Sequence, residues 1–353
     1  MSKLANGNSY VKQIDGLRFF AVMLVAFQHW VLNPMEILFP SGLIGVTLFF
    51  VLSGFLITTI LLVSKAKSEA NGKPKRWFIK QFYIRRFLRI FPLYYMVVGL
   101  LFLFNVSYVR YSIWWLLSYT INFRFAMDSK FTPIIAHFWS LSIEEQFYLI
   151  YPFLLLFINS KNLLRFFFTF ILVGVGSRLL FYLIGVSDRS NTFISTTCFD
   201  AFGLGGLLAY LVMYKREWAE KNICSYKFLI INCVVLGSLA LLRYRYGDTE
   251  TLRVVWFRFF ISSIAMWFVA KSYFGFGGLV GKILENNFLV YTGKISYGWY
   301  VYHNIVPYMF AAMGYKQTLM MIIPYFIATY IIAAISWKLV EHPINELKNK
   351  FQY

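Results

Sequence analysis

The stretch from Gly16 to Trp30, GLRFFAVMLVAFQHW, is apolar enough for a membrane helix except at Arg18 and His29. Helix geometry places these two side chains on one face, about three turns or 16 Å apart along the axis. Asp15 falls close to the same face. The stretch therefore predicts a membrane helix with one polar face.

The composition extends this reading to the whole chain. Of its 353 residues, 59% are hydrophobic and 14% are charged, which excludes a soluble domain and predicts a polytopic membrane protein. The net charge of +19 must be read by position, because cytoplasmic loops collect Lys and Arg. We therefore expect membrane lipids as partners, and no nucleic acid.

Ten apolar segments are long enough, at roughly 17 to 25 residues, to cross a bilayer. We expect one all-α transmembrane domain over residues 1–353, with both termini cytoplasmic and the chain integral to the cytoplasmic membrane. The predicted segments are 14–33, 42–63, 91–108, 138–158, 164–185, 198–214, 227–243, 254–273, 294–313 and 318–339.

An eleventh candidate, SIWWLLSYTINF at residues 112–123, is short and aromatic. If it does not cross, 24 of the 34 Lys and Arg lie on the inner side, counting Arg18 there, and eight lie on the outer side. If it does cross, every later loop changes sides and this bias weakens. The charge pattern therefore predicts a re-entrant or interfacial element.

Three of the predicted helices carry polar stripes at membrane depth, where ionisable groups usually mark a site. The stripes are Asp15, Arg18 and His29 in the first helix; His137, Glu144 and Tyr148 in the fourth; and Ser296, Trp299 or Tyr300, and His303 in the ninth.

Each stripe also has a structural interpretation. Arg18 could extend to lipid phosphate, and His29 or His303 could be a neutral hydrogen-bonding residue between helices. Glu145 projects about 100° away from Glu144, so one site cannot easily use both, and we expect Glu145 to be an interfacial carboxylate or one that supports the site through its neighbours.

His29 and Glu144 are expected at a similar depth on different helices. An imidazole and a carboxylate at one level can act as a general base and the group that orients it. The sequence has no serine in a nucleophile elbow and no metal-ligand spacing, so we expect no metal. Direct transfer to a substrate hydroxyl is the more economical mechanism, and a covalent intermediate stays open.

The basic segment RWFIKQFYIRRFLRIFPLYY, residues 76–95, precedes and enters the third predicted helix. Arg85, Arg86 and Arg89 lie within one helical turn and form a guanidinium cluster on the predicted cytoplasmic side. This cluster could follow the positive-inside rule or hold a helix on anionic lipid. It could also be a multidentate phosphate site.

Together these segments resemble the membrane-bound acyltransferase 3 family, which O-acylates cell-surface carbohydrates. The resemblance covers nearly the whole chain in the family's order. It rests on the segments IDGLRFFAVMLVAFQH, GVTLFFVLSGFLIT, FYIRRFLRIFPLYY, FWSLSIEEQFYLIYP, ISYGWYVYH and WKLVEHP.

The resemblance implies transfer of an acyl group, expected to be acetyl, from cytoplasmic acyl-coenzyme A to a cell-surface or lipid-linked saccharide. It implies that His29 and Glu144 serve the transfer and that Arg18, Arg85, Arg86 and Arg89 contact the donor. Asp15, His137, Tyr148 and His303 are expected to support them. Many relatives carry an added extracytoplasmic hydrolase-like domain; we expect none here, and hence completion by the chain itself or by a separate extracytoplasmic partner.

One alternative of another class stays open. A transporter or flippase for an acyl donor or glycolipid would also place charged residues on facing helices, without chemistry.

Overall fold

The computed structural model describes residues 10–31, 40–106, 108–128, 133–246 and 252–351, and all regular structure within these ranges is helical. The longer helices are α1 (Lys12–Trp30), α2 (Ser41–Asn71), α3 (Lys75–Leu103), α6 (Phe138–Phe157), α7 (Leu163–Leu183), α9 (Phe199–Tyr214), α11 (Tyr226–Tyr246), α12 (Arg258–Phe274) and α17 (Ile322–Ser336). The shorter helices are α4 (Ile113–Leu117), α5 (Ile121–Met127), α8 (Asp188–Phe193), α10 (Arg216–Asn222), α13 (Gly278–Leu284), α14 (Asn287–Lys294), α15 (Ser296–Tyr302), α16 (Val306–Ala312) and α18 (His342–Glu346).

In the described ranges, five helical segments are long and apolar enough to cross a membrane, and two bent helix pairs raise this number to seven. The predicted first and fourth segments are present as α1 and α6, of 19 and 20 residues, but are not among the seven. The fold is therefore that of a multi-pass helical membrane protein. The count of ten crossings and the side of each terminus stay predictions.

Two predicted segments differ from the structure in their bounds. Segment 294–313 is not one helix: it is divided among the end of α14, α15 and α16, and Pro307 lies in the first turn of α16, where a proline starts a helix. The third segment begins at Lys75, well before residue 91, so the arginine cluster lies on α3 itself.

The segment 112–123 forms two short helices, α4 and the start of α5, neither of which is long enough to cross a bilayer. They are separated at Tyr119, whose φ of 52° is left-handed and cannot continue a helix. Gln146 of α6 donates hydrogen bonds to the Tyr119 carbonyl and to Asn122, at 2.7 and 2.9 Å. This polar contact fixes the segment against α6.

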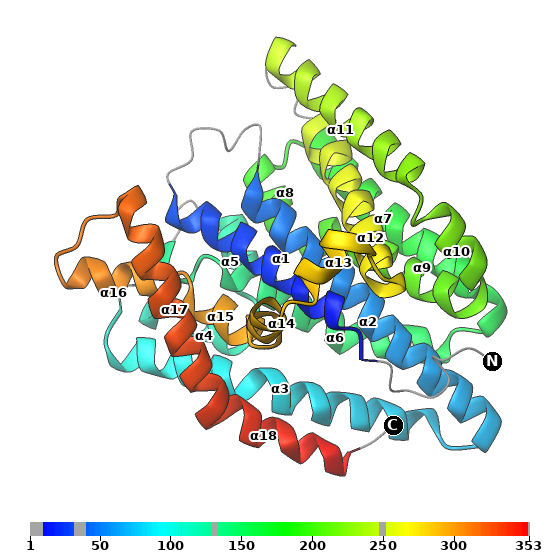
Figure 1. The fold of residues 1–353 in the computed structure, drawn as a ribbon, viewed down its shortest axis with the longest axis horizontal. Coiled ribbons are helices and arrows are strands. Elements are labelled where there is room, and N and C mark those ends of the chain that lie inside the picture. The colour runs from blue at the N-terminus through cyan, green and yellow to red at the C-terminus, as the bar shows by residue number, and fades with distance from the viewer. Residues whose placement is uncertain (1–9, 32–39, 107, 129–132, 247–251, 352–353) are drawn as a thin grey trace.

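Helix α2 lies at the centre of the bundle, where it packs against α1, α6, α9 and α12. Figure 1 shows α1 and α2 in the middle of the molecule, with α3 and α18 along one side and α11 along the opposite side. Helices α2 and α9 approach each other closely at two glycines. A Cβ on Gly54 would collide with the Phe202 carbonyl, and one on Gly205 with the Val51 carbonyl, so the two backbones need glycine there.

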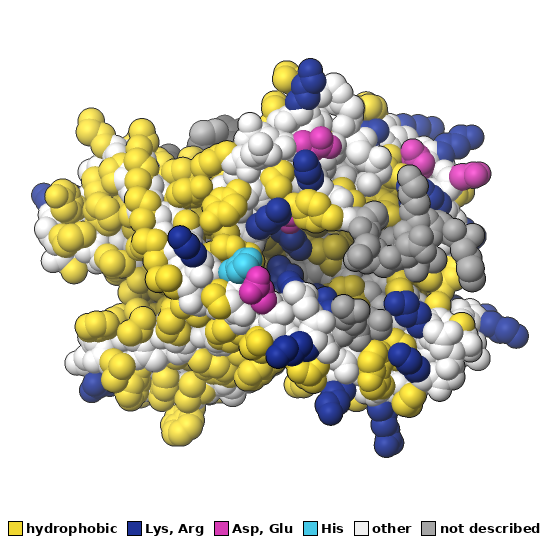
Figure 2. All heavy atoms as spheres, turned by 60° about the horizontal axis from the view of Figure 1, so that its bottom comes forward, with side chains coloured by type: hydrophobic (Ala, Val, Ile, Leu, Met, Phe, Trp, Pro, Cys, Tyr) yellow, Lys and Arg dark blue, Asp and Glu magenta, His cyan; other side chains and the backbone are white. Residues whose placement is uncertain are grey.

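The outer surface is partly apolar. On α17, Ile323, Ile327, Ile331 and Ile335 recur every four residues and are each about half exposed or more. Figure 2 shows that hydrophobic side chains cover one half of the visible face, whereas Lys and Arg gather on the other half. A large exposed apolar surface of this kind suits contact with lipid.

Candidate functional site

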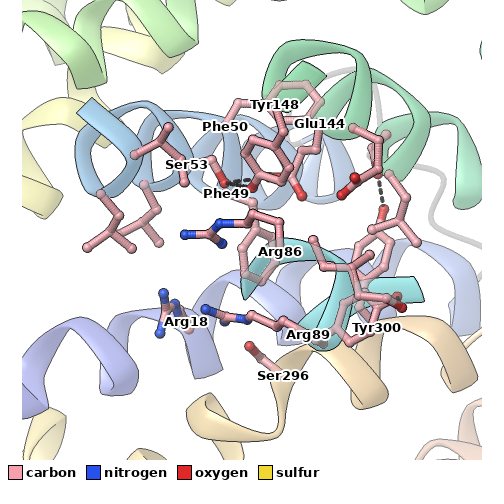
Figure 3. Close-up of a pocket in the computed structure, with 18 of the residues that line it drawn as sticks. Arg18, Phe49, Phe50, Ser53, Arg86, Arg89, Glu144, Tyr148, Ser296 and Tyr300 are labelled. Carbon is pink, nitrogen blue, oxygen red and sulfur yellow. Dashed lines mark hydrogen bonds between the residues drawn. The ribbon is translucent and has the colours of Figure 1, made fainter. Parts of the chain in front are cut away.

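A cavity of about 100 Å³ lies between α1, α2, α3, α6 and α15. We call it the arginine pocket. Its wall combines apolar side chains, most of them from α2, with charged and polar groups from all five helices (Figure 3). The charged and polar residues that line it are Arg18, Ser53, Arg86, Arg89, Ser140, Glu144, Glu145, Tyr148, Ser296, Tyr297 and Tyr300.

Three guanidinium groups converge on this pocket from two helices, as Figure 3 shows for Arg18, Arg86 and Arg89. Arg18 forms an ion pair of 2.6 Å with Asp15, which also accepts a hydrogen bond of 2.7 Å from Tyr10. Partial burial and the Asp15 carboxylate raise the pKa of Tyr10, so its hydroxyl donates at neutral pH.

Arg86 and Arg89 differ from Arg18 because they form no hydrogen bond or ion pair with any residue that the structure describes. The Arg86 guanidinium stacks on two aromatic rings, 5.3 Å from the centroid of Tyr148 and 5.6 Å from that of Phe82. Buried Arg178, by contrast, binds Asp200 through two hydrogen bonds of 2.7 and 2.8 Å. Unpaired guanidinium groups at a cavity are suited to bind an anion.

Arg85 lies outside the arginine pocket, although the sequence grouped it with its neighbours. It donates hydrogen bonds to the backbone carbonyls of Phe351, at 2.9 Å, and Lys348, at 3.5 Å. Successive residues of a helix point about 100° apart, so Arg85 faces the C-terminal segment while Arg86 faces the pocket.

Both carboxylates of α6 line the pocket. Glu144 accepts a hydrogen bond of 2.6 Å from Ser53, whose hydroxyl is also 2.9 Å from that of Tyr148. Glu145 lines the same cavity, although the sequence predicts that one site cannot easily use both carboxylates. Glu144 and Glu145 do project about 100° apart on α6. Both reach the cavity because it extends around this side of the helix.

The pocket ends at a polar contact between α6 and α15. The hydroxyls of Ser140 and Tyr300 are 2.5 Å apart, and Tyr300 also donates to the His137 carbonyl at 3.1 Å. Both side chains are buried. The Tyr300 ring lies 5.6 Å from the His137 ring and 5.3 Å from the His303 ring, between centroids, so it forms a wall between the pocket and the histidines.

Beyond this wall, His29, His137 and His303 form what we call the histidine cluster. Their ring centroids are 4.8 to 6.4 Å apart. His303 Nε2 lies 3.0 Å from His29 Nδ1, across 274 residues of sequence. In the part of the chain that the structure describes, no three His, Cys, Asp or Glu are arranged to hold a metal ion.

The structure does not bring His29 and Glu144 together as a pair. The partners of His29 Nδ1 are the Val25 carbonyl and His303, whereas Glu144 binds Ser53 in the pocket. The supporting residues separate in the same way. Tyr148 lines the arginine pocket and Asp15 pairs with Arg18 of that pocket, whereas His137 and His303 belong to the histidine cluster.

Ser53, Ser140 and Tyr297 line the pocket but were not predicted from the sequence. Ser53 is a polar residue inside a long apolar helix, and this signal was visible in VLSGFLIT. Ser140 and Tyr297 stand beside motif residues that were singled out, and only their position against other helices distinguishes them from ordinary polar residues.

Known proteins with similar sequences identify the family of this chain. The sequence profile of an acyltransferase domain matches residues 11–338. A candidate O-acetyltransferase of Staphylococcus aureus strain COL is 31% identical over 363 residues, which cover 96% of this chain and 58% of that protein. The O-acetyltransferase OatA of Staphylococcus aureus strain NCTC 8325 is 27% identical over 369 residues, covering 96% and 57%.

The chain thus spans less than two thirds of the length of these relatives. No solved structure shows significant similarity to it. The profile match begins just before α1 and extends past the end of α17, so it includes every helix around the arginine pocket and the histidine cluster. The chain belongs to the acyltransferase 3 family.

Proposed function

We propose that this chain is a membrane O-acyltransferase that moves an acyl group, in the first instance acetyl, from acyl-coenzyme A to a hydroxyl of a cell-surface or lipid-linked saccharide. The observation that carries the proposal is the convergence of Arg18, Arg86 and Arg89 on one cavity, where two of the three have no ion-pair partner among the described residues. The O-acetyltransferase names of the relatives support the acetyl group.

The size of the pocket suggests which part of the donor it accepts. Its volume of about 100 Å³ is below the roughly 300–1,000 Å³ of sites that enclose a drug-sized ligand. We therefore place only the thioester end in the cavity, against apolar residues such as Phe49, Phe50 and Leu52. The phosphates remain with the guanidinium groups of Arg18, Arg86 and Arg89, which offer bidentate hydrogen bonds.

The chemistry of the transfer is assigned to His29. Its imidazole takes the proton from the acceptor hydroxyl, whose oxygen attacks the carbonyl carbon of the thioester. The carbon–sulfur bond then breaks, and the coenzyme A thiolate leaves and takes the proton from the imidazolium. The wall at Tyr300 must shift for the thioester to meet His29, because the two lie on opposite sides of it.

The orientation of the chain follows the charge pattern. We propose that the donor enters from the cytoplasm, where Lys and Arg are concentrated, and that the saccharide meets His29 nearer the outer face of the cytoplasmic membrane. If the chain does not complete the transfer itself, we propose that a separate extracytoplasmic protein receives the acyl group.

Calorimetry of the purified full chain in detergent tests donor binding. Acetyl-coenzyme A should bind at least about ten-fold more tightly than S-acetylpantetheine, which lacks the nucleotide and its phosphates. Equal affinity for the two would contradict the role of the arginines.

Transfer is tested with membrane vesicles from cells that express the chain. Radiolabelled acetyl groups from acetyl-coenzyme A should become attached to endogenous glycan as alkali-labile esters. Binding of the donor without any such transfer would favour transport of the donor in place of catalysis.

A further inference from the structure

The histidine cluster is held by backbone carbonyls. His303 Nδ1 lies 2.6 Å from the Tyr300 carbonyl, and His29 Nδ1 lies 3.1 Å from the Val25 carbonyl. His303 is fully buried, whereas His29 is partly exposed. The three histidines come from α1, from the residue before α6 and from the residue after α15, so the tertiary fold alone assembles them.

These contacts assign the protons on two of the rings. A carbonyl oxygen only accepts hydrogen bonds, so Nδ1 carries the proton in both His303 and His29. His303 Nε2 then holds a lone pair and lies 3.0 Å from His29 Nδ1, so the single Nδ1–H of His29 is shared between this nitrogen and the Val25 carbonyl. His29 Nε2 is left unprotonated and free to accept a proton.

We infer that His303 is the positioning residue for His29. It takes the place that the sequence analysis gave to Glu144. The inference rests on the proposed function, because it presupposes that His29 is the base. When His29 Nε2 takes the proton of the acceptor hydroxyl, its Nδ1–H continues to donate to His303 Nε2, which orients the imidazolium and stabilises its charge.

A neutral imidazole suits this position. A carboxylate would need other polar partners in an apolar part of the bundle, because an unpaired buried charge is costly. The rings of Tyr300 and Trp299 flank His303 at centroid distances of 5.3 and 6.5 Å, and the Tyr300 carbonyl fixes its orientation. His303 is therefore held before the substrate arrives, as a positioning group requires.

The kinetic test uses the same vesicles at varied acetyl-coenzyme A concentration. His303→Leu should lower the maximal rate by about a hundred-fold, with the KM for acetyl-coenzyme A nearly unchanged. His303→Gln should recover most of this loss, because its amide oxygen can accept from His29 Nδ1. The matched control is Gln317→Ala, which removes hydrogen bonds to the His29 and Trp30 carbonyls but not to the ring, and should leave the rate unchanged.

A second readout does not depend on activity. Diethyl pyrocarbonate modifies an unprotonated imidazole nitrogen, and peptide mass spectrometry can follow His29 with exposed His342 as the internal reference. His303→Leu should slow modification of His29 by about three-fold, and His303→Gln should restore it. Each variant should bind coenzyme A with unchanged affinity in calorimetry, because the proposed coenzyme A site lies on the other side of Tyr300. Unchanged affinity shows that the variant is folded.

The inference is overturned if His303→Leu keeps the maximal rate, or if neither readout distinguishes His303→Gln from His303→Leu. An active His29→Ala variant would instead refute the base assignment in the proposed function. The two failures are therefore distinguishable.

Discussion

The arginine pocket and the histidine cluster lie on either side of Tyr300, and they differ in how their polar groups are paired. In the pocket, Arg86 and Arg89 have no ion pair among the described residues. In the cluster, His29 and His303 each have a ring nitrogen within hydrogen-bond distance of a backbone carbonyl, and the two rings also contact each other through His29 Nδ1 and His303 Nε2. Unpaired guanidinium groups can bind an anionic ligand, whereas the fixed His29–His303 pair leaves His29 Nε2 available for proton transfer.

The strongest test of this division is His29→Ala. It should lower acyl transfer by about a hundred- to ten-thousand-fold, the usual contribution of a general base. Mass spectrometry of alkali-labile acetyl groups on the cell-surface glycan measures it. Coenzyme A affinity should not change, because His29 does not line the pocket. Near-normal acetylation would show that the histidine cluster does not take part in acyl transfer.

Glu144→Gln tests the pocket from its carboxylate side. The amide keeps the shape of the side chain but cannot carry a negative charge beside the guanidinium groups that position the donor, so transfer should fall by about a hundred-fold while coenzyme A binds at least as tightly. Glu145→Gln, in the same pocket, should have a smaller effect because Glu145 lacks the hydrogen bond that Ser53 gives Glu144. Weaker coenzyme A binding in the Glu144 variant would contradict this account.

The neighbouring arginines of α3 provide a matched comparison. Arg86→Lys and Arg89→Lys should each weaken coenzyme A binding by about ten-fold, because lysine keeps the charge but loses the planar fork. Arg85→Lys should change it little, since Arg85 binds the Phe351 carbonyl outside the pocket. If calorimetry finds the three variants alike, the arginines act only as general positive charge.

The smallest expected effect concerns the wall between the two regions. Tyr300→Phe removes the contact with the Ser140 hydroxyl and should loosen the end of the pocket. The rate with butyryl-coenzyme A relative to acetyl-coenzyme A should rise by about three-fold. Tyr297→Phe is the control, because its hydroxyl binds the Ile90 carbonyl of α3 and not the wall. An unchanged ratio in the Tyr300 variant would mean that the wall does not limit the acyl group.

Much of the architecture could be predicted from the sequence because lipid imposes a local rule. A long apolar run such as that in α2 must form a helix, since every backbone polar group in hydrocarbon needs a partner within its own segment. The same rule makes Arg18, His29 and Glu144 conspicuous. It does not predict where a helix breaks, so 294–313 was expected as one segment although it is divided among three helices.

What the sequence by itself determined was the class of protein, the order of its motifs and the set of polar residues that needed a reason to lie at membrane depth. Only the tertiary structure decided which of them meet. It separated Arg85 from Arg86, placed Glu145 beside Glu144 in one pocket, and gave His29 a partner in His303. The reason is physical: helical periodicity fixes the angles within one helix, but contacts between helices 274 residues apart depend on how their faces pack.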